Sequence, residues 1–159
     1  MGLAEIASAE ERAACDAVID AWTRARLEEP DGALVAVDRQ AELGRWYLRL
    51  RGDEKDFVTI WLTVRQRTLH HEAQVMPAPE TNIAETFEYL LRRNADLYQM
   101  RFALGPEDAV YLVGELPIAA VTSDELDRVV GSTLQYVDAC FPTAMGIGYA
   151  GIYRRRPRR

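Results

Sequence analysis

The order in which helical and strand-like segments follow one another constrains this chain most. A helical pattern leads into three stretches in which apolar and polar residues alternate, followed by a second helical pattern, two more alternating stretches and a third helical pattern. A repeat of 3.6 residues indicates an amphipathic helix, and a repeat of two indicates a half-buried strand. The sequence therefore predicts an α+β domain with the element order α-β-β-β-α-β-β-α.

Capping signals place the three helices. Ser8 opens a capping-box pattern and begins the first helix. The second begins after Thr81 or Asn82. The third begins at Ser123 and has the longest apolar face in the chain. We expect Pro142 to end it, because proline cannot donate the helical hydrogen bond.

Strand patterns occupy five segments: 45–51, 57–64, 68–76, 98–104 and 109–116. The stretch 33–43 contains a short apolar run but no clear alternation, so a strand and a loop are both open there. We find no linker or internal repeat, and residues 1–153 are predicted to form one domain.

Charge is distributed unevenly along the chain. The net charge is −6, and the last six residues include five arginines: Arg154, Arg155, Arg156, Arg158 and Arg159. Without them 14 basic residues face 25 acidic ones, which leaves −11 on the body. Such a body repels nucleic acid and anionic lipid, so neither is predicted as a partner. Residues 154–159 are predicted to be a disordered, solubilising tail.

The composition also predicts a compartment. Residues 1–20 contain five acidic side chains and no apolar run, and no stretch approaches 18 consecutive apolar residues. We therefore expect neither a signal peptide nor a membrane span, and a cytoplasmic protein. Cys15 and Cys140 are predicted to be reduced thiols in the core, although a disulfide between the first and last helices stays open.

Two motifs suggest chemistry that their context does not support. Residues 146–151 spell G-x-G-x-x-G, but a helix and Pro142 precede them and only eight residues follow. Dinucleotide binding needs this run between a strand and a helix, so an irregular C-terminal segment is expected instead. His70 and His71 are adjacent in a strand and point to opposite faces, so they cannot share an ion. We predict no metal, no cofactor, no catalytic residues and no enzyme.

Aromatic residues supply the candidate binding surface. Tyr47, Phe57 and Trp61 fall on the strand faces opposite to the strongest aliphatic rows. They could cover core, or they could form an open row that a partner contacts if helices cover only one side of the sheet. The second interpretation makes these three residues the predicted partner-binding site.

Four segments carry a resemblance to a known family: Val75-Met76-Pro77, Leu90-Leu91-Arg92-Arg93-Asn94, Leu112-Val113-Gly114-Glu115-Leu116-Pro117 and Leu126-Asp127. Together they resemble the YbjN domain family from Asp20 to Tyr153. The family is similar in fold to type III secretion chaperones, which implies a twisted antiparallel sheet packed with three helices and a homodimer. Its label is sensory transduction regulator, and it brings no catalytic residues to this chain.

The resemblance and the residues together predict a non-enzymatic, dimeric, protein-binding module whose client or regulatory partner is unknown. The dimer is expected to form through an apolar stripe on the second helix, made of Ile83, Phe87, Leu90 and Leu91. A regulator that binds a small ligand between sheet and helices is the alternative, and an unrecognised enzyme is a third possibility.

Overall fold

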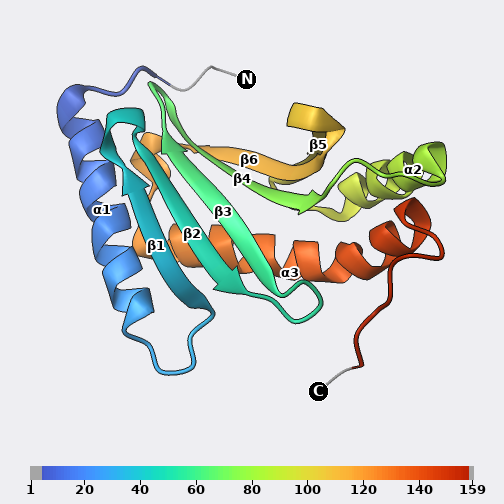
Figure 1. The fold of residues 1–159 in the computed structure, drawn as a ribbon. Coiled ribbons are helices and arrows are strands. Elements are labelled where there is room, and N and C mark those ends of the chain that lie inside the picture. Colours follow the sequence, from blue (N-terminus) through green and yellow to red (C-terminus); the bar gives the residue numbers. More distant parts are fainter. Residues whose placement is uncertain (1–4, 158–159) are drawn as a thin grey trace.

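The computed structural model describes residues 5–157. Six strands form one antiparallel sheet in the order β1-β2-β3-β4-β6-β5, and three α-helices accompany it (Figure 1). The helices are α1 (Ala9–Leu27), α2 (Ile83–Arg93) and α3 (Ser123–Gly148). The strands are β1 (Leu34–Gln40), β2 (Arg45–Arg51), β3 (Phe57–Val64), β4 (Thr68–Met76), β5 (Met100–Leu104) and β6 (Val110–Pro117). Four 3-10 turns connect them: η1 (Ala41–Leu43), η2 (Asn94–Asp96), η3 (Pro106–Asp108) and η4 (Ile118–Ala120).

The predicted α+β class is confirmed, and the stretch left open is a sixth strand. β1 pairs with β2 in antiparallel register, with Val37 opposite Leu48. The register shifts between Leu34 and Ala36, and only Leu34 of this edge strand is buried. An edge strand with an irregular register carries little alternation, which is why the sequence pattern was ambiguous.

One face of the sheet packs against α1 and α3. Ile19 of α1 and Leu126 and Val129 of α3 share a single buried cluster with Leu48 and Ile60 of the sheet. Helix α2 packs against α3 instead, near its C-terminal end (Figure 1). Since both long helices lie on the same side, the alternate residues of the strands face away from this core.

Helix starts agree with the capping signals more closely than helix ends do. Ser8 and Glu11 form the predicted capping box, with hydrogen bonds of 2.7 and 3.1 Å. Thr122 caps α3, one residue before the predicted cap Ser123. Asn82 precedes α2 with a left-handed backbone, and its side chain donates to the Ile147 carbonyl rather than capping its own helix.

The expectation that Pro142 ends the third helix is wrong. Helix α3 continues through it to Gly148, so the expected irregular segment is helical up to that residue. Ala144 and Gly148 are buried, and the Gly148 carbonyl accepts from the amides of Glu80 and Thr81. These tertiary contacts outweigh the local cost of proline.

The C-terminal segment turns back towards the sheet. Residues 154–157 of the predicted disordered tail lie against the β2–β3 hairpin, and residues 158–159 lie outside the described part of the chain. Over residues 5–157, none of the helices combines the length and hydrophobicity needed to cross a bilayer.

Candidate partner-binding site

An aromatic row crosses the sheet face that lies opposite to α1 and α3. Tyr47 of β2 is the cross-strand partner of Trp61 of β3, and their rings meet edge to face with centroids 6.3 Å apart. Tyr111 of β6 lies on the other side of Trp61, with centroids 6.4 Å apart and ring planes inclined by 49°. We call these three residues the aromatic row. All three side chains are half-buried, so each presents part of its ring to solvent.

Polar groups fix and border the aromatic row. The Tyr47 hydroxyl donates to Gln40 Oε1 over 2.8 Å, which orients that ring. Glu72 of β4 lies opposite Trp61 in register, and its carboxylate is 3.6 Å from His70 Nε2. Burial lowers the pKa of His70, with Glu72 opposing the shift. The face therefore carries an aromatic strip bordered by polar side chains.

Phe57 lies on the same sheet face but apart from the aromatic row. It begins β3, its side chain is 40% exposed, and the Arg49 guanidinium stacks 4.0 Å from its ring centroid. The structure thus brings together two of the three predicted residues, Tyr47 and Trp61, and leaves Phe57 beside the β2–β3 hairpin.

Tyr111 is the member that the sequence did not reveal. The alternation in β6 places Tyr111 opposite to the buried Val110 and Leu112, so its exposure could have been inferred. Its neighbours could not, because β6 pairs with β4, and α2 and β5 separate the two strands in the chain. Local periodicity does not specify such a pairing.

The apolar stripe of α2 divides between the core and the surface. Ile83 and Leu91 are 50% and 68% exposed, Phe87 is half-buried and Leu90 is only 3% exposed. Leu90 therefore packs within this chain and offers little area to a second one. Beside it lies an apolar hollow of about 230 Å³ between α2 and the edge strand β5, lined by Phe87, Leu90, Leu91, Phe102, Ala103, Leu104 and Val110. We call this hollow the α2–β5 groove.

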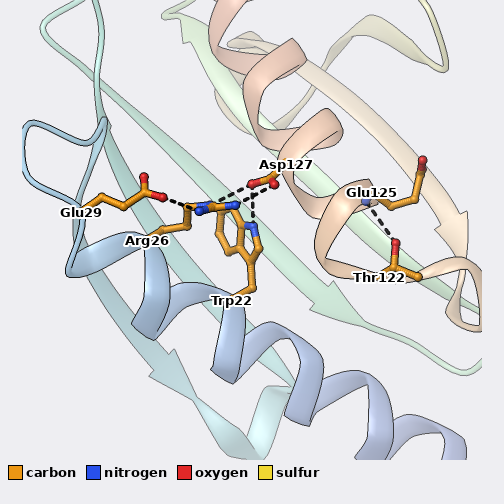
Figure 2. Close-up of polar contacts among 6 residues, drawn as sticks. All are labelled: Trp22, Arg26, Glu29, Thr122, Glu125 and Asp127. Carbon is orange, nitrogen blue, oxygen red and sulfur yellow. Dashed lines mark hydrogen bonds and ion pairs between the residues drawn. The ribbon is translucent and has the colours of Figure 1, made fainter.

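A polar junction holds α1 against α3 (Figure 2). The Asp127 carboxylate accepts from Trp22 Nε1 over 2.9 Å and from Arg26 Nε and Nη2 over 2.8 and 2.7 Å. Arg26 also pairs with Glu29. The Arg26 contact, more than any other, lowers the pKa of Asp127. Asp127 lies in the first turns of a helix whose start is fixed by the Thr122 cap. The position of its carboxylate is therefore determined by the start of α3.

A hollow of about 400 Å³ lies beside this junction. Leu34 and Leu50 are among its lining residues, and a side chain at Gly131 would meet nothing within 4 Å. The charged groups at this site, Arg26, Glu29 and Asp127, already pair with one another. The junction therefore explains the packing of two helices better than it explains a ligand.

The two histidines and the glycine run, which suggested metal or dinucleotide binding, do not take the positions that such sites need. His70 lies on the outer sheet face, whereas His71 is 3% exposed on the core side. Gly146 and Gly148 lie in the last turns of α3, where the free backbone groups are carbonyls rather than amides. Within residues 5–157, no three His, Cys, Asp or Glu side chains gather as they would to hold a metal ion.

Known proteins resemble this chain at two levels. The model of the YbjN family, described as "Putative bacterial sensory transduction regulator", matches residues 16–144. The uncharacterized protein Rv0487 of Mycobacterium tuberculosis is 33% identical over 108 residues, which is 68% of this chain and 59% of that protein. The uncharacterized protein ML2442 of Mycobacterium leprae is 31% identical over 120 residues, covering 76% and 60% respectively. The chain thus spans about three fifths of the length of these relatives.

The fold is also found in a solved complex. The Yersinia pestis type III secretion chaperone SycH, crystallised with a stable fragment of YscM2, superposes with a TM-score of 0.54. The alignment covers 79% of this chain and 98% of the chaperone at 16% identity, which shows a shared fold. Fold and function are separate questions, so the role of this chain rests on its own surfaces.

Proposed function

The chain belongs to the YbjN family, and we propose that it is a non-enzymatic, homodimeric protein-binding module whose partner lies across the aromatic row. The family description names a regulator and the fold neighbour is a chaperone, which supports a non-enzymatic role. The neighbour in fold holds a partner protein, which supports a protein-binding role here without naming the partner. Two buried free cysteines, Cys15 and Cys140, agree with a reducing compartment, and we propose the cytoplasm.

The single observation that carries this proposal is the position of Trp61 between two tyrosines on a sheet face opposite to α1 and α3. Tryptophan and tyrosine dominate binding hot spots because they bury large areas at low entropy cost and keep a polar tip. An apolar segment of a partner could lie along this strip. Because the net charge is −6, basic residues on the partner would assist the encounter at long range.

Replacing Trp61 tests the proposal. We expect Trp61→Ala to weaken binding by about 2 kcal/mol, as for a hot-spot residue, while the melting temperature changes little. Peptides selected from a displayed library on the wild-type protein provide the probe, and their affinities are then compared between variants. Tyr98→Ala is the matched control, since Tyr98 is 61% exposed and lies outside the aromatic row. It should leave the affinities unchanged.

The competing account makes Trp61 a core residue. Its truncation would then cost about 3–5 kcal/mol of folding stability. A collapsed melting temperature for Trp61→Ala, or equal affinities for Trp61→Ala and wild type, would contradict the proposed surface.

A small-ligand regulator is the second candidate function. The 400 Å³ hollow beside Gly131 favours it, because small-molecule sites commonly start at about 300 Å³. The mutual pairing of Arg26, Glu29 and Asp127 weighs against it. A small molecule retained by the purified protein in native mass spectrometry would favour this candidate over the first.

A further inference from the structure

The β2–β3 hairpin is held rigidly from behind. Asp138 of α3 accepts the backbone N–H groups of Asp53, Glu54 and Lys55 over 2.9, 3.0 and 3.1 Å. Lys55 Nζ donates to the carbonyls of Gln74 and Val75 over 2.7 and 3.3 Å. The turn is thereby joined to α3 and to β4. This anchoring leaves the acidic side chains of the hairpin directed at whatever lies in front of it.

What lies in front of the hairpin is the chain's own arginine-rich segment. The Tyr153 ring meets Phe141 of α3 edge to face, with centroids 5.7 Å apart. Beyond it, Arg155 Nε donates to Glu54 Oε2 over 3.1 Å, and Arg156 pairs with Asp56. One aromatic anchor followed by two ion pairs thus docks the segment on the hairpin.

The segment is held weakly and does not fill the space it covers. The side chains of Arg155, Arg156 and Asp56 are 50%, 63% and 53% exposed, whereas that of Glu54 is 17% exposed. Ion pairs with arginines this exposed are weakened by solvent screening. Two hollows of about 420 and 690 Å³ remain around the segment, and Phe57 lines both of them. A rigid acidic turn with unfilled space around it can accept a larger occupant than the segment it now holds.

We propose that this hairpin is a docking site for an arginine-rich segment of a partner protein, and that residues 153–157 occupy the site in cis until the partner displaces them. Charge complementarity selects the occupant: Glu54 and Asp56 each bind one guanidinium, and Phe141 takes an aromatic ring. Phe57 already carries the Arg49 guanidinium on its ring, a contact that a further arginine could repeat. This surface is separate from the aromatic row, so either proposal can fail without the other.

A trans-binding experiment tests the proposal. A fluorescent peptide with the sequence of residues 152–159 is titrated into the full chain and into a shortened chain that ends after Ile152, which removes Tyr153 from Phe141. A tethered segment has an effective concentration of about 1 mM. For a peptide with a Kd near or below about 100 μM, we therefore expect binding to the shortened chain to be at least about tenfold tighter than to the full chain. Added salt should weaken this binding, because the contacts are exposed ion pairs.

Charge-neutral variants locate the site. In the shortened chain, Glu54→Gln with Asp56→Asn should abolish the gain in peptide affinity. The matched control is Glu107→Gln with Asp108→Asn, which removes one glutamate and one aspartate charge from the β5–β6 turn. This control should keep the gain in peptide affinity. Equal binding to the full and shortened chains, or equal loss in both double variants, would overturn the proposal. A full chain that is dimeric while the shortened chain is monomeric would also overturn it, since the occupant would then be the tail of a second copy.

Discussion

The pairing of His71 with Gly114 shows how single residues adapt to one another across the sheet. The two are opposite each other in β4 and β6, on the core side. A Cβ atom on Gly114 would come within 2.4 Å of the His71 ring and 2.7 Å of the Gln99 carbonyl oxygen. The glycine therefore makes room for a buried imidazole, and burial lowers the pKa of His71 to about 4.

His71 should make folding sensitive to mild acid. Its pKa is lower in the folded chain than in the unfolded one, where it is near 6.5. The contribution of neutral His71 to the stability of the folded chain is complete above about pH 6.5. It is lost as the pH falls towards 4, because over this range only the unfolded chain takes up a proton at His71. We expect the free energy of unfolding to fall by about 2 kcal/mol between pH 7 and pH 5. Denaturant titrations over this range measure it.

Comparison of two variants isolates the histidine responsible. His71→Gln should flatten the slope between pH 7 and pH 5, whereas His70→Gln on the outer face should leave most of it. An unchanged slope in His71→Gln would show that other groups cause the acid sensitivity.

At the scale of elements, the β2–β3 hairpin depends on a residue remote in sequence. Asp138 lies one turn before Pro142, and the proline removes the amide that would have bonded to the Asp138 carbonyl. The side chain of the same residue is the acceptor for three hairpin amides. A helix that continues through a proline therefore also anchors a turn between two strands.

Removing this anchor should loosen the hairpin. We expect Asp138→Ala to lower the free energy of unfolding by about 2 kcal/mol, since hydrogen bonds to a charged acceptor are lost and three amides lose their partner. Hydrogen exchange at Asp53, Glu54 and Lys55 should accelerate. Gln135→Ala, an exposed position on the same helix, is the control, and a loss of similar size in both variants would refute the anchoring role.

Helices and strands could be predicted wherever the repeat of apolar residues lies within a single segment of the sequence. The alternation of 45–51 and 57–64 reflects burial on one face, and the structure gives both strands those bounds. β1 could not be identified because an edge strand buries only Leu34. The end of α3 could not be placed because the Gly148 carbonyl accepts hydrogen bonds from the amides of Glu80 and Thr81, which are distant in sequence. The same holds for the candidate site: Tyr47 and Trp61 share a local hairpin, whereas Tyr111 joins them only through β4–β6 pairing.

At the scale of the whole molecule, the α2–β5 groove is the surface best suited to a second copy. Ile83, Leu91 and Leu104 are all at least half exposed, and Leu91 and Leu104 line the apolar hollow at the β5 edge of the sheet. Exposed apolar area next to an unpaired strand edge favours association. A two-fold arrangement would place the same patch of both copies in contact.

Replacing one of these leucines tests the dimer. We expect the wild-type chain to have twice the mass of the 18.0 kDa monomer in light scattering at tens of micromolar, roughly above common dimer constants. Leu91→Asp should be monomeric and still folded, because Leu91 is 68% exposed. Leu43→Asp, at a similarly exposed leucine beside β1, should stay dimeric. A monomeric wild type would contradict the proposed assembly.

The chain has one lysine, Lys55, and its amine points inward to two backbone carbonyls of β4. Burial lowers its pKa, and the amine is held by these two carbonyls. Acylation of this side chain therefore requires the amine to leave the two β4 carbonyls. The labelling rate of Lys55 by an amine-reactive dye therefore reports how often these bonds open. Measured on the proteolytic peptide that contains Lys55, this rate is separated from labelling of the α-amine, and no engineered probe is needed.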